Sequence, residues 1–194
     1  MKQQTLLGYH FVGDTLRDGR PVPKNGRWLK HVGPVVPCES GLHMSVEPFD
    51  ALQLAPGNTL CRVELRGDLQ EHDGNKWVGR ERKIIARIDA TTLLRRFACD
   101  CALSVAHLWD MPAVVREYLE TMDESKRAAA GAARAAWDAW AARAAARDAR
   151  DAWAARAAAR AAGAAARAAG ATAADAQRKD FNARVVKAFE EAGK

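Results

Sequence analysis

Short apolar runs separated by glycine and proline dominate the first half of the chain. Residues 5–12 (TLLGYHFV) form an apolar and aromatic run that ends at Gly13-Asp14, and residues 59–65 (TLCRVEL) alternate polar and apolar side chains. Runs of this length and pattern are typical of β-strands. Shorter candidate strands lie at residues 27–31, 33–37 and 41–45.

The strongest hairpin signal in the chain lies just before another apolar run. Asp73-Gly74 stands within residues 71–75 (EHDGN), and Asp-Gly pairs favour the tight turns that join antiparallel strands. We therefore predict that residues 76–78 pair with residues 82–88 (RKIIARI), the apolar run that follows.

Helix signals complete the first domain and then continue to the end of the chain. A short helix is indicated over residues 49–54, and Asp89 is placed to cap a longer one, because an aspartate side chain accepts hydrogen bonds from the free N–H groups of a first helical turn. The sequence therefore predicts an α+β fold. A compact mixed domain with short antiparallel strands and one or two helices covers residues 1–110, and a long α-helical C-terminal region covers residues 111–194.

Three helices are expected in the C-terminal region. Asp110-Met111-Pro112 marks the start of a docking helix over residues 111–124, since aspartate is a good N-cap residue and proline is tolerated in a first helical turn. An alanine- and arginine-rich helix over residues 126–170 and an amphipathic helix over residues 175–192 follow. We expect the last helix to fold back on the domain or to pair with a second copy of the chain, through apolar residues at helical spacing. These residues are Phe181, Val185, Val186 and Phe189.

Charge and composition single out residues 126–170. Of these 45 residues 27 are alanine and none is valine, leucine, isoleucine or phenylalanine, so the segment cannot build a core of its own. It carries nine basic and three acidic residues, a balance of +6 that equals the net charge of the whole chain. Attraction to nucleic acid or to an acidic protein would therefore arise here. A solubilised helix without a polyanionic partner is the alternative interpretation.

Neither membrane insertion nor metal binding is expected. No stretch reaches the roughly 18 apolar residues that a membrane span needs, and the start of the chain lacks the apolar run of a signal peptide. We expect a cytoplasmic protein with reduced cysteines. Cys99 and Cys101 lie two positions apart in a predicted helix, where their side chains point about 200° apart and do not converge on one ion.

Candidate chemistry lies in three separate segments. The common phosphate-loop, HExxH and GxSxG signatures are absent from the sequence. A histidine, His10, stands in the first predicted strand; residues 40–45 read SGLHMS and precede a short helix; and Glu81 stands just before the apolar strand over residues 82–88.

In this order the three segments resemble the ADP-ribosyltransferase-like fold, in the branch that includes the RNA 2′-phosphotransferases and the diphtheria-toxin-like enzymes. The resemblance implies that the first-strand histidine holds a ribose of NAD, that the glycine-leucine segment frames the nicotinamide, and that the glutamate orients the attacked ribose. It implies catalytic roles for Glu81 and His10, and NAD-binding roles for His10, Gly41, Leu42, His43 and Ser45.

The resemblance covers residues 5–90 and departs from the family in two respects. His43 stands where tyrosine is usual, and no arginine-serine-threonine or glutamate-x-glutamate motif occurs. A histidine ring can still stack and donate a hydrogen bond. The implied chemistry needs a carboxylate near the positive charge that develops when the glycosidic bond to nicotinamide breaks. NAD would be a substrate and not a permanently bound cofactor.

The first part of the chain also resembles an uncharacterised group of small phage and prophage proteins with variable alanine- and arginine-rich tails. Two functions follow as expectations. The first is a phage-encoded accessory protein whose ADP-ribosyltransferase-like domain binds or acts on NAD or a nucleotide in the host cytoplasm. The second is a non-enzymatic binding protein that engages a host or phage protein or nucleic acid through its basic helical region, with His10 and Glu81 as ordinary strand and surface residues.

Overall fold

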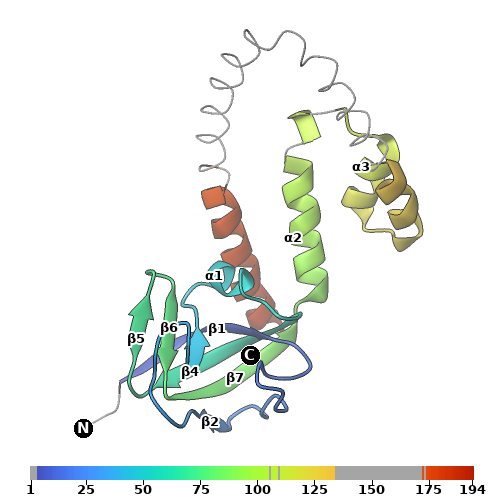
Figure 1. Cartoon of the computed structure of the whole chain (residues 1–194). Helices are drawn as coiled ribbons and strands as arrows, with labels where there is room; N and C mark the ends of the chain where they lie inside the picture. Colours follow the sequence, from blue (N-terminus) through green and yellow to red (C-terminus); the bar gives the residue numbers. More distant parts are fainter. Residues whose placement is uncertain (1–3, 105, 109, 134–171, 173) are drawn as a thin grey trace, which may run out of the picture. The chain divides into compact units, whose positions relative to one another are not determined.

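The computed structural model describes residues 4–104, 106–108, 110–133, 172 and 174–194 (Figure 1). The chain divides into two compact units. The first unit comprises residues 1–94 together with residues 178–194, and the second comprises residues 95–177. The second unit is therefore an insertion between two parts of the first, and the domain boundary expected near residue 110 falls inside it.

Two antiparallel sheets form the first unit, and the mixed α+β class expected from the sequence is confirmed. The larger sheet has the strand order β1-β4-β7-β2, and the smaller has the order β3-β6-β5. The strands are β1 (Thr5–Val12), β2 (Trp28–Lys30), β3 (Leu42–Met44), β4 (Thr59–Arg66), β5 (Gln70–His72), β6 (Lys76–Gly79) and β7 (Glu81–Asp89). The helices are α1 (Pro48–Leu52), α2 (Thr91–Ser104), η1 (Ala106–Leu108) and α3 (Ala113–Thr121), with further helical segments at 124–133 and 174–191.

The Asp-Gly turn forms as expected but joins a different pair of strands. Asp73 and Gly74 have φ values of 56° and 69°, the two positive values of a hairpin turn whose twist matches the flanking strands. The turn links β5 to β6, while β7 pairs with β4 and β2. The predicted pairing of residues 76–78 with 82–88 is therefore wrong. The residues before the turn form the strand β5, and β6 pairs with β5 because the tight turn places the two strands side by side.

A second expected strand is missing for a simple reason. Residues 33–37 form only an isolated bridge, between Val36 and Ser40. The segment contains Pro34 and Pro37, and proline has no N–H group to donate to a strand ladder.

Side chains of the central strand β4 alternate between two covered faces of the larger sheet. Cys61, Val63 and Leu65 point to what we call the inner face, where they pack in one core cluster with Leu42 and Met44 of β3. Gly8 permits this close approach, because a Cβ atom there would lie 2.4 Å from the carbonyl oxygen of Ser45. Tyr9 and Ser45 exchange backbone hydrogen bonds at this crossing, of 2.7 and 3.0 Å.

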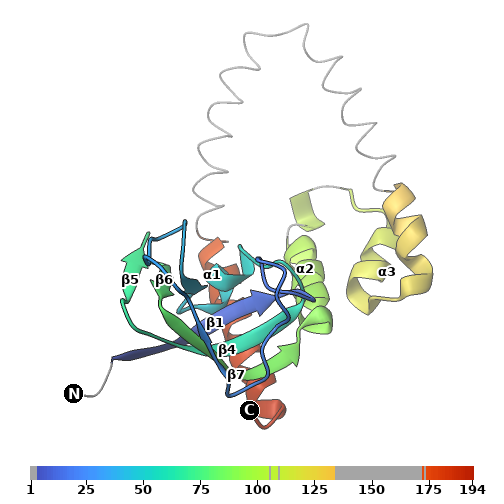
Figure 2. The same ribbon diagram turned by 60° about the horizontal axis from the view of Figure 1, so that its bottom comes forward.

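The other face of the sheet, the outer face, is covered at one end by α1 and the C-terminal helix (Figures 1 and 2). Phe181, Val185 and Phe189 are 0–2% exposed, and the rings of Phe189 and Tyr9 lie 6.2 Å apart. The amphipathic helix expected over residues 175–192 is confirmed. It packs on its own domain, which is one of the two partners expected for it, the other being a second copy of the chain.

Polar contacts fix the position of this helix against α1. The backbone N–H of Phe49 donates to Asn182 Oδ1 at 2.9 Å. Arg178 lies 2.7 Å from the carboxylate of Asp50, which is buried. A buried carboxylate is stable only when paired in this way, so Asp50 and Arg178 hold residues from the two ends of the chain together.

Of the two helix caps predicted from the sequence, at Asp89 and at Asp110, the structure confirms the first. Asp89 caps α2, accepting hydrogen bonds from the N–H and hydroxyl groups of Thr91 at 2.9 and 2.6 Å. Asp110 does not cap α3, whose N-cap residue is Pro112 and has no side-chain capping bond.

In the second unit, Arg96 donates to the carbonyls of Leu119 and Glu120 at 2.6 and 2.9 Å, which ties α2 to the end of α3. Docking of α3 on the first domain concerns the placement of the two units and stays a prediction. The alanine- and arginine-rich helix expected over residues 126–170 is described only to residue 133, and its remainder lies outside the described residues.

Replacing Phe181 by alanine removes a fully buried ring from the outer-face core. We expect the free energy of unfolding to fall by about 3–5 kcal/mol, because both apolar burial and close packing are lost. Val186→Ala is the matched control, since Val186 lies on the same helix but is 46% exposed, and it should change stability by less than about 0.5 kcal/mol. Urea unfolding followed by circular dichroism measures both. Equal effects would show that the helix is not part of the core.

Candidate functional site

His10 is a partly buried residue of β1 whose side chain lies on the inner face. Its Cα partner across the sheet is Cys61 of β4, and directly opposed residues in adjacent strands share a face. The pKa of His10 is held well below its ordinary value, first by burial and then by the positive charge of Arg82 and by His43. The ring is therefore neutral near pH 7, and it lies within electrostatic reach of both residues.

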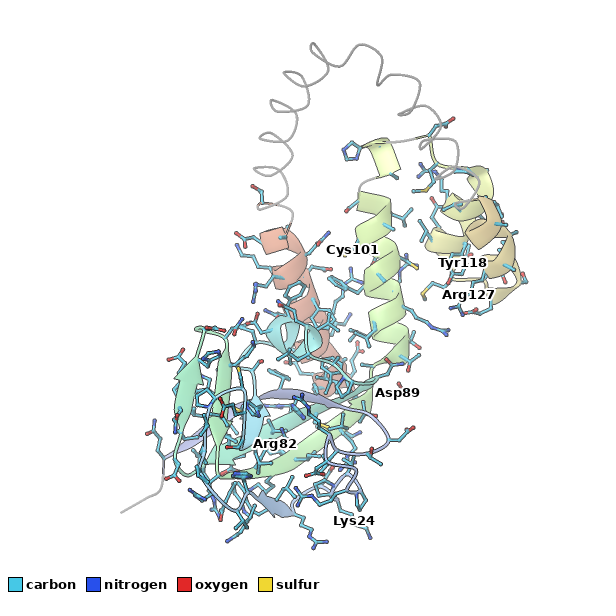
Figure 3. The ribbon with its side chains drawn as sticks, in the orientation of Figure 1. Lys24, Arg82, Asp89, Cys101, Tyr118 and Arg127 are labelled. Carbon is cyan, nitrogen blue, oxygen red and sulfur yellow. The ribbon has the colours of Figure 1, made fainter. Side chains whose placement is uncertain are left out.

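Arg82 is the most unusual residue of the inner face. It is only 6% exposed and projects from β7 into the strands of the first unit (Figure 3). Burial lowers the pKa of its guanidinium to about 10, so the group stays charged at pH 7. One of its Nη1–H groups donates to the carbonyl oxygen of His43. Among the described residues no carboxylate forms an ion pair with it.

His43 of β3 contributes an imidazole beside this guanidinium. Burial lowers its pKa, and the charges of Arg82, Arg17 and Lys76 lower it further, while a hydrogen bond to the Gly41 backbone acts in the opposite direction. Its Nε2 atom is buried and has no hydrogen-bond partner within the part of the chain that the structure describes. Buried polar atoms without a partner are uncommon in folded proteins.

The other residues expected at the site, Gly41, Leu42 and Ser45, lie in or next to β3, the strand that carries His43, and stabilise it. Gly41 has φ of 114° and a Cβ there would lie 2.5 Å from Val78 Cγ2, so only glycine fits this entry to β3. Leu42 packs in the inner-face core, and Ser45 is buried and bonded through its backbone to Tyr9. Their assignment to NAD binding stays a prediction.

Glu81 lies on the opposite face of the sheet from His10. Its Cα partner in β4 is Arg66, which alternation places on the outer face, whereas the partner of His10 is Cys61 on the inner face. Glu81 is paired with Lys30 at 2.8 Å and with Arg66 at 2.6 Å. Hydrogen bonds from these two residues lower its pKa. The structure therefore brings His10 and His43 together but does not bring Glu81 to them.

The outer face around Glu81 is a ladder of paired charges and one aromatic ring. Arg66 and Lys83 lie over the ring of Trp28, 3.7 and 4.5 Å from its centroid, and Lys83 pairs with Glu64 at 2.7 Å. Each charge in this ladder already has a partner inside the protein. A carboxylate held in this way stabilises the sheet and is not poised to act on a ribose bound on the other side.

Other candidate sites are weaker. Within the described ranges, no group of three or more histidine, cysteine, aspartate or glutamate side chains is arranged to hold a metal ion. Cys38, Cys61 and Cys99 form no disulfide with any described residue, and on α2 Cys99 is buried and Cys101 partly exposed. A hollow of about 70 Å³ on the sheet is lined by residues that include Leu7, Tyr9 and Arg62 but neither His10 nor His43. None of the described helices combines the length and the apolarity needed to cross a membrane.

Arg82 was not singled out from the sequence, although a signal for it exists. In a strand with period-2 alternation, Arg82 shares the side of Ile84, which is the apolar and therefore inward side. The flanking Arg80 and Lys83 make the residue look like one more member of a solvated charge run. Only the pairing of β7 with β4 shows that Arg82 faces the core, since its Cα partner is Leu65, whereas the partner of Lys83 is Glu64.

Comparison with known proteins adds a family match to this geometry. Residues 6–96 match the family model of a Domain of unknown function (DUF7666). The match covers the two sheets and the start of α2. No curated protein matches the chain. No solved structure matches it. The resemblance to an uncharacterised family is thus supported for the first domain.

A structural role for Glu81 can be tested through acid stability. A carboxyl group with a lowered pKa in the folded state stabilises the fold above its unfolded pKa, near 4.5, and loses that contribution as the pH falls below it. We expect Glu81→Gln to be less stable than wild type at pH 7, with the difference shrinking as the pH falls below 4.5.

The control is Glu71→Gln, because Glu71 is exposed on β5 and its replacement should change stability at pH 7 by less than about 0.5 kcal/mol. Urea unfolding at several pH values gives the comparison. A Glu81→Gln variant as stable as wild type at pH 7 would contradict the structural role.

Proposed function

We propose that this protein is a non-enzymatic binding protein that engages nucleic acid through its basic segment, residues 126–170. The observation that carries the proposal is the distribution of charge. The segment has a balance of +6, while the rest of the chain has 21 basic and 21 acidic residues and is neutral. Phosphate backbones attract such a segment without any requirement for sequence.

The pairing of charges elsewhere supports this assignment to the basic segment. In the first unit, Lys30, Arg66 and Lys83 are paired with glutamates on the outer face, and Arg80 is paired with Asp68. Basic groups neutralised in this way contribute little to binding a polyanion. In the basic segment, Lys126 and Arg127 are paired with Glu117 and Glu124, and the other seven basic residues stand against three acidic ones in the sequence.

The connection of the segment to the first unit also suits a binding role. Residues 1–94 and 178–194 belong to one compact unit, so both ends of the insertion that contains the segment lead into the same domain. A segment attached at both ends loses less conformational entropy on binding than a free tail. On this proposal the α+β domain is the scaffold and the insertion is the contact surface.

The sequence resemblance to phage proteins supports a proposal about where this function is carried out. The first part of the chain resembles small phage and prophage proteins, and we propose that the protein acts as a phage accessory factor in the cytoplasm of the host. The nucleic acid would then be that of phage or host. The buried apolar face of the C-terminal helix is occupied by its own domain, so this proposal assigns it no role in assembly.

An ADP-ribosyltransferase-like activity toward NAD is the second candidate, favoured by the proximity of His10 and His43. It requires a carboxylate near the oxocarbenium-like transition state. Glu81 lies on the other face of the sheet, which is why we rank this function below binding. Hydrolysis of NAD by the wild type that Glu81→Gln removes, without loss of folding, would reverse the order.

Binding to labelled double-stranded DNA and single-stranded RNA, followed by fluorescence anisotropy from 50 to 200 mM salt, tests the proposal. We expect affinity to fall steeply with salt, because each phosphate neutralised releases bound counterions. Replacing Arg143, Arg147, Arg156 and Arg160 by glutamine should weaken binding and flatten the salt dependence. The same four positions changed to lysine form the charge-matched control and should retain most of the binding. Absence of binding at 50 mM salt, or binding independent of salt, would refute the proposal.

A further inference from the structure

We propose that Arg82, His10 and His43 form a binding site for a small oxyanion, the phosphate or carboxylate group of a ligand, on the inner face of the larger sheet. This site is separate from the basic segment and does not depend on nucleic-acid binding.

The first argument is an uncompensated charge. Arg82 is 6% exposed, and a buried guanidinium is costly unless an anion compensates for the water it has lost. The described residues offer none. Cys61 is the acidic group whose charge would act on Arg82, but burial raises the pKa of its thiol to about 11, so it is neutral. The absence of a counter-charge among the described residues points to a bound anion.

The second argument is independent and concerns hydrogen bonds. The guanidinium has five N–H donors in a planar fork, and the described part of the chain provides it with one acceptor, the carbonyl of His43. The buried Nε2 atom of His43 has no partner there either. The lowered pKa leaves the ring of His43 neutral, and its other nitrogen is bonded to the Gly41 backbone, so Nε2 is an acceptor. The oxygens of a carboxylate or a phosphate accept from the guanidinium fork, and the P–OH group of a monoprotonated phosphate can in addition donate to Nε2.

The electrostatic surroundings favour an anion from every side. His10 faces the site from β1 and Cys61 from β4, while Arg17 and Lys76 act on His43 from the first loop and from β6. Arg82 is the cation that acts on both histidines. His10 and His43 are only partly buried.

Thermal unfolding of the full-length protein in inorganic phosphate, in acetate and in sodium chloride at equal ionic strength tests the site. A ligand that binds only the native state raises the unfolding midpoint in a saturable way. We expect such a rise with phosphate or with acetate and not with chloride. Saturation with phosphate identifies a phosphate ligand, and saturation with acetate identifies a carboxylate. A midpoint that responds to neither anion beyond the chloride value would overturn the proposal.

Variants assign the effect to the three residues. Arg82→Met should abolish the stabilisation, and Arg80→Gln is its matched control, because Arg80 lies two positions away but is paired with Asp68 at 2.5 Å. Should Arg82→Met fail to fold, His10→Gln and His43→Leu serve instead. The His43 carbonyl that accepts from Arg82 is retained in His43→Leu, and each histidine variant should weaken anion binding at least tenfold. Unchanged binding in both would overturn the proposal.

The glutamine variant of the basic segment separates this site from the proposed function. It should lose nucleic-acid binding and keep the full response to phosphate or acetate. Arg82→Met, or the histidine variants, should show the reverse. Loss of the anion response in the basic-segment variant would show that the anion binds the segment and not the sheet.

Discussion

Alternation of side chains along β4 is the constraint on which the rest of the first unit depends. Each face of this central strand needs a cover, and the chain supplies two different ones. The inner face packs against β3 and its sheet, while the outer face receives the C-terminal helix through Phe189 and its contact with Tyr9. A sheet with one uncovered apolar face would be unstable in water, so the last residues of the chain are part of the domain core.

The packing of both faces of the larger sheet explains how the basic segment is attached to the first unit. Because residues 178–194 complete the core begun by residues 1–94, everything between them is an insertion. Residues 126–170 of the insertion contain no valine, leucine, isoleucine or phenylalanine, so their composition is not that of a hydrophobic core. A helix-forming, positively charged composition is compatible with this position in the chain, and it concentrates the net charge where the core does not need it.

The same alternation separates the chemistry of the two faces. The outer face is a ladder in which Glu81, Arg66 and Lys30 neutralise one another, and it behaves as sheet-stabilising surface. On the inner face, Arg82 has no counter-charge among the described residues and lies beside two histidines whose pKa values are lowered. The charges of Glu81 and Arg82 therefore differ in their surroundings, because the described residues supply ion-pair partners to Glu81 and none to Arg82.

Local signals in the sequence were sufficient for much of the fold. The strands at residues 5–12 and 59–65, the Asp-Gly turn, the cap at Asp89 and the amphipathic C-terminal helix all follow from hydrophobic period and from hydrogen bonds between near neighbours. The candidate site did not follow, because the order of the segments that contain His10, His43 and Glu81 along the chain does not say which side of the sheet each residue faces. Only strand pairing decided that His10 and Glu81 face opposite ways, that β6 joins β5, and that Arg82 is buried. These outcomes depend on register between residues far apart in sequence, where a shift of one residue reverses every side chain.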